Sequence, residues 1–402
     1  MPTAAVLTTG CRLNQSESDA LRRKLLEQGV TLVADPARAD SCFVNTCTVT
    51  AAADRSSTQL IRRVCRQHPR PRVVVMGCLA ERAAATVRRI PGVSEVWDNS
   101  RKQAEIEGCI PSPARSRAFL KVQDGCSRRC RYCVVSGLRG APRSTPAASV
   151  CSKFRRLVAD GYQEVVLTGL NLGTYRDVDG TTLAGLLVRL LALPGRFRIR
   201  LGSIEPETVD EALLEVLSEP RICPHLHLPL QSGDDNLLRS MDRPCTTTQY
   251  MSLLDQLVAQ RPDVCLGADV IAGLPGEDEV SFRRTVSFIS RSPAAYLHAF
   301  SFSPRPGTGA AAMSGVADRS EVRARVGELR RMSDERRKSY EARFAGTVRQ
   351  AVVESHRTGL TDNYMRLRIC ALGDLKRGEL RDFAIGSSDF GLTGSCADLT
   401  NM

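Results

Sequence analysis

Three cysteines stand close together in the middle of the chain, at Cys126, Cys130 and Cys133. Their spacing, with three and then two residues between them, lets one loop direct three thiolates at one metal group. A 4Fe-4S cluster is normally held by four thiolates, so a loop that supplies three leaves one iron open to a ligand from outside the protein. Zinc is the alternative, although a zinc site needs a fourth ligand and usually pairs two short motifs.

A second set of cysteines is dispersed over the first part of the chain: Cys11, Cys47 and Cys78. Each lies just after a predicted strand, at residues 4–7, 42–44 and 73–76, and each follows turn-forming residues. The carboxyl ends of parallel strands share one edge of a sheet, where open α/β sheets place their ligands. We therefore expect three more thiolates to meet and to hold a second cluster. Three unrelated buried cysteines are the alternative.

Nine further cysteines show no ligand-like spacing, which favours a role as small buried hydrophobic residues. They are Cys42, Cys65, Cys109, Cys151, Cys223, Cys245, Cys265, Cys370 and Cys396. The N-terminal residues do not resemble an export signal, and thiols inside cells are kept reduced. A disulfide framework is therefore disfavoured, and metal or redox chemistry is expected.

Hydrophobic patterning predicts an α/β protein with three domains. Residues 1–110 alternate strands with helices, which indicates a parallel sheet flanked by helices. In residues 111–343, six further strand and helix pairs predict a partial (β/α)6 barrel. Residues 344–402 alternate in short pieces, which predicts a small β-barrel. A linker is expected where Pro111, Pro113 and the basic stretch from Arg115 to Arg117 interrupt the pattern.

The expected elements of the central domain are specific. Strands are predicted at residues 119–122, 164–168, 197–201, 225–229, 265–271 and 296–302. Helices are predicted at 147–160, 182–193, 207–217, 236–260 and 277–290, with a long basic connecting helix at 318–344. The loop with Cys126 then follows the first strand, at the end of a barrel where active sites are built.

The cysteine loop, together with LTG at 167–169 and GLPGE at 273–277, resembles the radical S-adenosylmethionine superfamily. The resemblance implies that the open iron binds S-adenosylmethionine, whose reductive cleavage gives a 5′-deoxyadenosyl radical. Gly169, Asn171, Glu205, Asp269, Gly273 and Gly276 are the expected contacts to this cofactor or to substrate. For Glu205, a carboxylate that merely starts a helix is the alternative.

Within that superfamily the whole chain resembles the methylthiotransferases. The motifs are GCRLNQSE at 10–17, NTCTVT at 45–50, GC at 77–78 and FLKVQDGC at 119–126. The segments at 200–206, 225–233 and 296–308 look most like the branch that acts on N6-threonylcarbamoyladenosine. The loop at 134–140 departs from the family pattern, and the segment from Ala371 onward matches TRAM domains, the family's small RNA-binding barrels, poorly.

This resemblance implies two 4Fe-4S clusters and a reaction at carbon-2 of the modified adenosine beside the anticodon of transfer RNA. Cys126, Cys130 and Cys133 would hold the radical-generating cluster, and Cys11, Cys47 and Cys78 the auxiliary cluster. Methylthiolation of isopentenyladenosine, or of a ribosomal-protein aspartate, is the alternative. A non-catalytic iron-sulfur RNA-binding sensor is a third reading, which the cysteine loop and the 273–277 loop oppose because a sensor needs no open iron.

Charge is consistent with an RNA partner. The formal net charge is +12, with arginine clusters at 62–63, 128–131 and 330–338, although ordinary solvated helix faces would read the same way. Tyr364 is either a stacking ring for RNA or a barrel-core residue. His225, His227 and His298 are either proton carriers or core histidines. No apolar run is long enough to span a membrane, so we expect a cytoplasmic protein. We also expect it to be a monomer.

Overall fold

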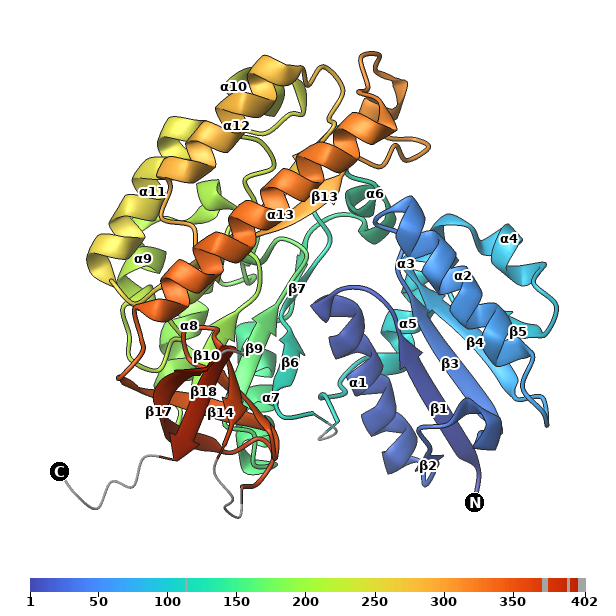
Figure 1. Cartoon of the computed structure of the whole chain (residues 1–402). Helices are drawn as coiled ribbons and strands as arrows, with labels where there is room; N and C mark the ends of the chain where they lie inside the picture. The colour runs from blue at the N-terminus through green and yellow to red at the C-terminus, as the bar shows by residue number, and fades with distance from the viewer. Residues whose placement is uncertain (113–114, 371–374, 389–390, 397–402) are drawn as a thin grey trace.

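A computed structural model describes the chain from residue 1 to 396 except for 113–114, 371–374 and 389–390; residues 397–402 also lie outside it. Pro113 of the predicted linker is therefore not described. In chain order the molecule comprises a parallel sheet with helices, a central set of strands with helices outside, and a small barrel (Figure 1). The predicted fold class is confirmed.

The N-terminal sheet has five parallel strands in the order β2-β1-β3-β4-β5. The strands are β1 Thr3–Thr8, β2 Thr31–Leu32, β3 Ser41–Thr46, β4 Arg72–Gly77 and β5 Val93–Val96. The helices are α1 Arg12–Glu27, η1 Pro36–Arg38, α2 Ala51–Cys65, α3 Cys78–Arg82, α4 Ala84–Arg88 and α5 Asn99–Ile106. The strand order reverses between β1 and β3, which is the place where flavodoxin-like sheets bind ligands.

The central part has six parallel strands in two bridged sheets, β10-β9-β6 and β11-β12-β13. They are β6 Ala118–Lys121, β9 Glu164–Thr168, β10 Arg198–Leu201, β11 His225–His227, β12 Cys265–Ala272 and β13 Tyr296–Ser301. Parallel bridges at Ile199–Ile222 and Ser203–His227 join the two sheets. Within the described chain no pairing connects β6 to β13, so the predicted partial barrel is confirmed and is open along that seam.

Helices cover the outside of these strands. They are α7 Ala147–Ala159, α8 Leu183–Leu191, α9 Glu211–Leu217, α10 Asp235–Ser240, α11 Thr247–Gln260 and α12 Glu279–Arg291, with short turns η2 Leu172–Thr174, η3 Pro206–Thr208 and η4 Gly309–Ala312. The connecting helix α13 Arg319–Ala342 crosses the central strands toward the barrel (Figure 1). The cysteine loop is framed by a hairpin, β7 Gln123–Asp124 with β8 Arg143–Ser144, and by α6 Val135–Arg139.

The single helix predicted at 236–260 is wrong. The structure has two helices, α10 and α11, and the turn between them contains Asp242 with φ +55°. Pro244 cannot donate to a continuing helix and restricts the residue before it. Thr246 then starts α11 afresh, with its hydroxyl and the side chain of Gln249 forming a capping box.

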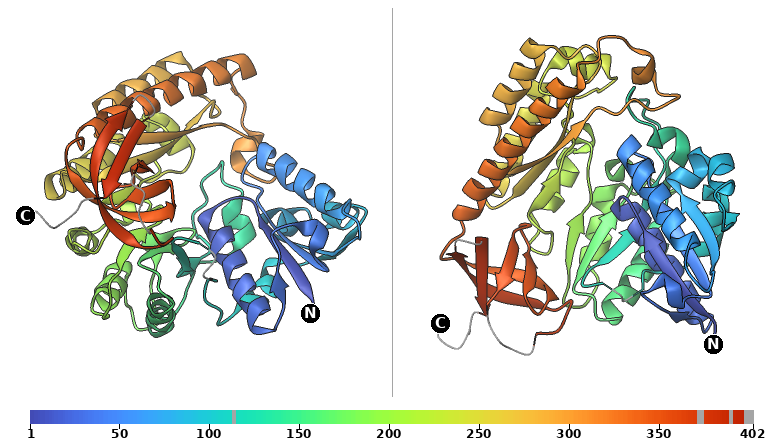
Figure 2. Two further views of the ribbon diagram at one scale, coloured as in Figure 1. Left: turned by 60° about the horizontal axis from the view of Figure 1, so that its bottom comes forward. Right: turned by 45° about the vertical axis from the view of Figure 1, so that its right-hand side comes forward.

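Helix α1 joins the N-terminal sheet to the open seam of the partial barrel. Its Ser16 hydroxyl donates to the carbonyl of Phe119 at 2.7 Å and accepts from the amide of Lys121 at 3.2 Å, both on the edge strand β6. Figure 2 shows the sheet lying as a separate layer beside the central strands. The N-terminal part is thereby fixed next to the cysteine loop.

The predicted C-terminal barrel is confirmed as a closed barrel in the order β14-β15-β16-β18-β17. Its strands are β14 Val348–Ser355, β15 Thr358–Thr361, β16 Arg366–Ile369, β17 Leu380–Ser388 and β18 Gly391–Cys396. Two buried arginines of β10 hold it: Arg198 donates to Gln350 O and Leu360 O, and Arg200 donates to Thr361 O and Asp362 O, all at 2.9–3.1 Å. Among the described helices, none is long and apolar enough to cross a membrane.

Candidate functional site

The central cysteine loop lies between β7 and α6. The amide of Cys126 donates to the carbonyl of Gly140 at 3.0 Å, and that of Cys133 donates to Cys130 O at 2.9 Å, so the loop is closed on itself. Cys130 is buried, while Cys126 and Cys133 are half-buried. Burial raises the pKa of Cys130, and the neighbouring Cys133 raises it further.

Two side chains from later in the chain, one in the loop after β9 and one in the turn between α10 and α11, donate to these sulfurs. Asn171, at the end of β9, lies with Nδ2 3.8 Å from the Sγ of Cys126. Arg243 lies with Nη1 3.9 Å from the Sγ of Cys130, and its charge opposes the effect of burial on the pKa of that thiol. Donors of this kind favour the thiolate that a metal group requires, and they orient it.

Glu205 stands at the N-cap position of the turn η3, but its side chain makes no cap hydrogen bond. Its carboxylate pairs instead with Arg243 at 2.6 Å. The structure thus places Glu205 and Asn171 close to the cysteine loop. Whether they contact S-adenosylmethionine stays a prediction.

The second cysteine set is assembled from three loops. Cys11 precedes α1, Cys47 follows β3, and Cys78 is the first residue of α3. Burial raises the pKa of Cys47 to about 11, and Cys11 and Cys78 are near enough to raise it further. Gly10, at φ +97°, is required here because a Cβ would lie 2.7 Å from the Cβ of Cys47 and 3.0 Å from its Sγ.

The spacing of the sulfur atoms bears on the choice between a zinc ion and an iron-sulfur cluster. Four thiolates around one zinc ion, with Zn–S bonds of about 2.3 Å, place their sulfurs roughly 4 Å apart. Among the described cysteines, no three sulfurs lie within 4.8 Å of one another. Neither described cysteine set therefore has the close sulfur spacing of a single zinc ion.

A group of five buried or half-buried ionic side chains, which we call the buried charge network, lies between the two cysteine sets. Its members are Glu17, Lys102, Lys121, Asp124 and Arg139. Burial alone would raise the pKa of Glu17, but Arg139, Lys102 and Lys121 together lower it well below its ordinary value. Glu17 is therefore a carboxylate although its side chain is fully enclosed.

A hydrogen-bonded group lines the interior of the partial barrel. The carboxylate of Asp269 lies 2.9 Å from His227 Nε2 and 3.3 Å from His298 Nδ1. The Tyr296 hydroxyl bridges His227 and His225, at 3.2 and 2.9 Å. Burial, then Arg200 and Arg12, lower the pKa of His225 well below its ordinary value, so it is neutral. His225 and His227 are core histidines, whereas His298 is half exposed.

A small cavity of about 190 Å³ joins these features. It is lined by Val49 and Thr50 from the loop after Cys47, by Cys133 and Tyr132 from the central loop, and by Asp269 and Phe300 from the barrel strands. Phe300 is 43% exposed, so part of its side chain is accessible. The cavity offers one aromatic face and one carboxylate beside both cysteine loops.

The three candidate glycines have other described neighbours. A Cβ at Gly169 would meet Gln123, and one at Gly273 would lie 2.4 Å from Val322 of α13. Gly276 has open space around it, and its amide donates to Gly315 O at 2.9 Å. Packing therefore explains Gly169 and Gly273, whereas Gly276 is favoured by its positive φ of +84°. Contact of these glycines with a cofactor remains a prediction.

Tyr364 agrees in part with the barrel-core reading, since its half-buried side chain packs against the core of the barrel. Its ring stacks on His225 with centroids 3.9 Å apart, and Arg12 donates to its hydroxyl at 2.9 Å. It therefore lies where all three parts of the molecule meet, between the barrel and the central strands. Such a ring is not free to stack on RNA.

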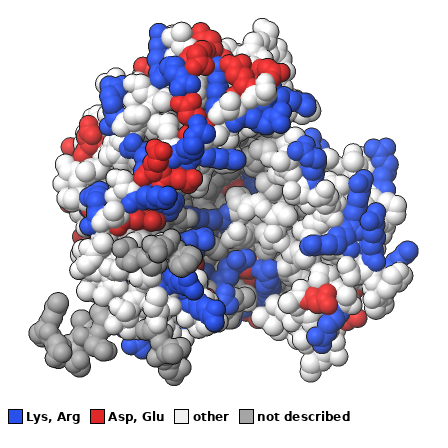
Figure 3. All heavy atoms as spheres, viewed as in Figure 1, with Lys and Arg blue, Asp and Glu red and all other residues white. Residues whose placement is uncertain are grey.

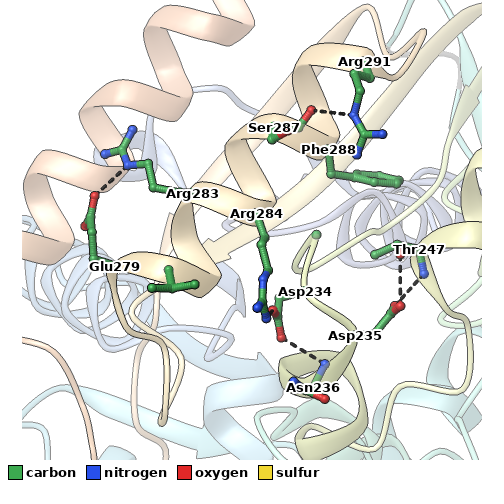
Figure 4. Close-up of a pocket in the computed structure, with 12 residues that line it drawn as sticks. Asp234, Asp235, Asn236, Thr247, Glu279, Arg283, Arg284, Ser287, Phe288 and Arg291 are labelled. Atoms are coloured by element: carbon green, nitrogen blue, oxygen red, sulfur yellow. Dashed lines mark hydrogen bonds and ion pairs between the residues drawn. The ribbon is translucent and has the colours of Figure 1, made fainter.

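A hollow on the outer helical surface carries no comparable chemistry. It has a volume of about 630 Å³ and lies between α10 and α12 (Figure 4). Its charged side chains pair within the protein, as Arg284 does with Asp234. Its lining includes no cysteine or histidine.

Comparison with known proteins agrees with this geometry. The Radical SAM superfamily model matches residues 120–289, and the model of the uncharacterized protein family UPF0004 matches residues 3–97. The threonylcarbamoyladenosine tRNA methylthiotransferase of Aquifex aeolicus is 34% identical over 90% of this chain and 95% of its own length. That of Bacillus subtilis is 34% identical over 91% and 90%. The chain belongs to the radical S-adenosylmethionine methylthiotransferases.

Solved structures support the fold of this methylthiotransferase. The radical S-adenosylmethionine methyltransferase TsrM of Kitasatospora setae, with cobalamin and a 4Fe-4S cluster bound, has a TM-score of 0.55 at 17% identity and covers 77% of each chain. The cobalamin-dependent enzyme OxsB has a TM-score of 0.53 at 10% identity and covers 84% of this chain and 56% of its own. At these identities the likeness concerns the fold.

Several side chains of the methylthiotransferase site could not be found from the sequence. Arg243 lies in the turn that was predicted as helix, and Phe300 sits in an ordinary strand pattern. Glu17 stands in a recognised motif and Arg139 in the loop that departs from the family pattern, and nothing in their spacing shows that they meet. In each case only the contacts in the folded structure identify the residue.

Proposed function

We propose that this enzyme methylthiolates carbon-2 of N6-threonylcarbamoyladenosine beside the anticodon of transfer RNA. The observation that carries the proposal is the 190 Å³ cavity, because its lining includes Val49 next to the N-terminal cysteine set and Cys133 of the central set. A base in that cavity would lie between the two sets. Such an arrangement suits a reaction that needs a radical and a sulfur at one carbon atom.

In this proposal the central cysteines hold one 4Fe-4S cluster with an iron free for S-adenosylmethionine, and the N-terminal cysteines hold the auxiliary cluster. When bound, these groups supply a 5′-deoxyadenosyl radical and a methylated sulfur. Asn171 and Arg243 orient two thiolates of the central set. Arg243 is itself held by Glu205, so its position is fixed from both sides.

The protein side chains of the cavity would hold the nucleoside. Enzymes that act on a base take it out of the stack and bind it between aromatic or apolar side chains. Phe300 offers such a face, and the carboxylate of Asp269 can accept a hydrogen bond from the base. Burial opposes ionisation of Asp269, but hydrogen bonds from His227 and His298 lower its pKa, so it remains an acceptor at neutral pH.

The surface supports an RNA substrate. Lysine and arginine side chains gather around the recess between the N-terminal part and the barrel (Figure 3). On the barrel strand β16, Arg366 and Arg368 are exposed and alternate with the buried Leu367 and Ile369. Cations placed in this way attract a phosphate backbone without reading sequence. The choice of threonylcarbamoyladenosine comes from the relatives, which are named for that nucleoside.

The test is mass spectrometry of nucleosides from transfer RNA of cells with and without the gene. We expect 2-methylthio-N6-threonylcarbamoyladenosine to disappear on deletion and to return with the wild-type gene but not with Cys126→Ala. Cys65→Ala, which changes a buried cysteine outside both sets, is the control and should restore the nucleoside. If the methylthio derivative of isopentenyladenosine disappears instead, the substrate is isopentenyladenosine and the enzyme is still a methylthiotransferase. No change in any methylthio nucleoside would refute the proposal.

A further inference from the structure

The buried charge network is costly as a means of holding the fold together. Glu17 and Lys102 have fully enclosed side chains, and that of Arg139 is 1% exposed. Replacing buried ion pairs by well-packed apolar residues is often neutral or stabilising, so their presence is weak evidence for a stabilising role. A reason for the network is therefore to be sought in what lies beside it.

The charges of the network do not balance among themselves. Three cations, Lys102, Lys121 and Arg139, face two carboxylates, Glu17 and Asp124. One positive charge is left over, and of the three cations only Lys121 has a partly exposed side chain, at 17%. The neighbouring group able to compensate it is the N-terminal cysteine set, once its thiols are ionised as metal ligands.

Arg139 is the member that reaches these cysteines. Its Nη2 lies 3.6 Å from the Sγ of Cys78 and 2.6 Å from the Oδ1 of Asn14, and Nη1 lies 2.6 Å from Glu17 Oε1. Its Nε is buried and has no hydrogen-bond partner within the described chain. The guanidinium is thus held by Glu17 and Asn14, and Nη2 is the nitrogen that reaches Cys78.

The main chain around Arg139 belongs to the other cysteine site. Arg139 ends α6, six residues after Cys133, and the next carbonyl, that of Gly140, accepts from the amide of Cys126 at 3.0 Å. Asn99 of α5 donates to the carbonyl of Leu138 at 2.8 Å, so α6 is also fastened to the N-terminal part. One short helix therefore contacts the central set through its backbone and the N-terminal set through its side chain.

We infer that Arg139 is a positioning residue that joins the two cysteine sites and sets the charge at the N-terminal one. A cation that donates to a ligating sulfur stabilises the reduced, more negative state of a cluster and raises its reduction potential. Because the same residue is anchored to the central loop, it also fixes the distance between the sites. The inference concerns Arg139 itself; that the group at Cys11, Cys47 and Cys78 is a cluster rests on the proposed function.

The main test is a redox titration followed by electron paramagnetic resonance. It uses the full chain with Cys126→Ala, Cys130→Ala and Cys133→Ala, in which the auxiliary cluster alone is reconstituted. We expect Arg139→Met to lower the midpoint potential relative to this parent and Arg139→Lys to restore most of the difference. Arg115→Met is the matched control, because Arg115 pairs with Asp19 of α1 and contacts no described cysteine; it should leave the potential unchanged.

The outcomes separate the inference from loss of folding. Equal potentials in the parent and in Arg139→Met would overturn it. If Arg139→Met does not retain iron, Arg139→Gln is titrated in its place, and an unchanged potential would again overturn the inference. Loss of the cluster from Arg139→Gln and Arg139→Lys, with Arg115→Met fully loaded, would also overturn the charge argument. Retention by Arg139→Lys alone would support it.

A second readout uses the enzyme with all six cysteines. If Arg139 sets the distance between the sites, Arg139→Met should still form 5′-deoxyadenosine, while methylthio nucleoside per 5′-deoxyadenosine falls by about 10- to 100-fold, the range for residues that support metal ligands. An unchanged ratio would remove the positioning role. If the wild-type enzyme forms no methylthio nucleoside, the proposed function fails, and the redox titration still decides the role of Arg139.

Discussion

The two cysteine sites are built in opposite ways. The central set comes from one loop, closed by hydrogen bonds between its own neighbours Cys126 and Gly140 and between Cys130 and Cys133. The N-terminal set comes from three loops at the edge of a parallel sheet, and its members are brought together by the pairing of β1, β3 and β4. The first site needs correct local structure, whereas the second needs a whole folded sheet.

The charged groups around the two sites also differ: they are few and local at the central set and come from several elements at the N-terminal set. At the central set, Arg243 is balanced by the single carboxylate of Glu205. At the N-terminal set, Arg139 belongs to a network drawn from α1, α5, α6 and the β6–β7 segment. The N-terminal site therefore depends on the contact between two parts of the molecule, and changes at that contact should affect it first.

The largest expected effect separates the two sites by function. Cys126→Ala should abolish both 5′-deoxyadenosine formation and methylthio nucleoside, because it removes a ligand of the radical-generating group. Cys47→Ala should abolish the methylthio nucleoside while 5′-deoxyadenosine still forms. Both products are measured by chromatography and mass spectrometry under anaerobic conditions. If Cys47→Ala stops both, the two sites do not have separate roles.

The next prediction distinguishes a buried ion pair that only holds the fold together from a charge that lies beside a cysteine ligand. Glu164 is fully buried between Arg198 and Arg200, which hold the barrel, and this group touches none of the six predicted cysteine ligands. Glu164→Gln should cost about 3–5 kcal/mol in the free energy of unfolding, since it leaves buried cations unpaired. Iron content should stay at the wild-type level. Loss of iron together with stability would show that the sites depend on barrel docking.

The same pair gives a pH dependence. Burial opposes ionisation of Glu164, but Arg200 and Arg198 lower its pKa below the unfolded value of about 4.3. Its contribution to stability is therefore present above about pH 4.3 and is lost as the pH falls further toward the folded pKa. The difference in unfolding free energy between wild type and Glu164→Gln should shrink in that range. A difference that stays constant down to pH 3 would contradict this assignment.

A glycine pair tests how closely the N-terminal site is packed. Gly10→Ala places a methyl group against Cys47 and forces a positive φ, which alone costs about 1–3 kcal/mol. Gly276→Ala, at φ +84° with open space around it, carries the backbone strain without the clash. Both should lower the unfolding free energy, but only Gly10→Ala should lose auxiliary iron. Equal iron content in the two variants would show that Cys47 has room to move.

The contrast between the two cysteine sites explains which parts of the molecule could be predicted from the sequence. The central site could be predicted because its information is local: the spacing of Cys126, Cys130 and Cys133 survives any error in the surrounding elements. The N-terminal site could be predicted as a meeting of strand ends, because parallel strands align whatever their exact limits. The six barrel strands and the small barrel were likewise readable from alternation.

The contacts that tune the sites could not be read in this way. Arg243 lies in a turn hidden within an apparently continuous helix pattern, since amphipathic periodicity continues across Pro244. Arg139 and Glu17 are far apart in sequence, and their meeting depends on how α1 docks against β6. The stacking of Tyr364 on His225 could not be predicted, because His225 belongs to another part of the chain. Docking between parts leaves no periodic signal in the sequence.

The smallest expected effect concerns a single hydrogen bond at the central site. Asn171→Ala removes the donor 3.8 Å from the Sγ of Cys126 but none of the ligands. Partners that orient metal ligands are typically worth 10- to 100-fold, and with one long contact we expect a loss of about 10-fold in 5′-deoxyadenosine formation. The auxiliary cluster should keep its midpoint potential, because Asn171 contacts the central loop and not the N-terminal set. Asn236→Ala, on the outer helical surface, is the control and should change neither quantity. A shift in auxiliary potential on Asn171→Ala would show that the central loop communicates with the second site by a route other than Arg139.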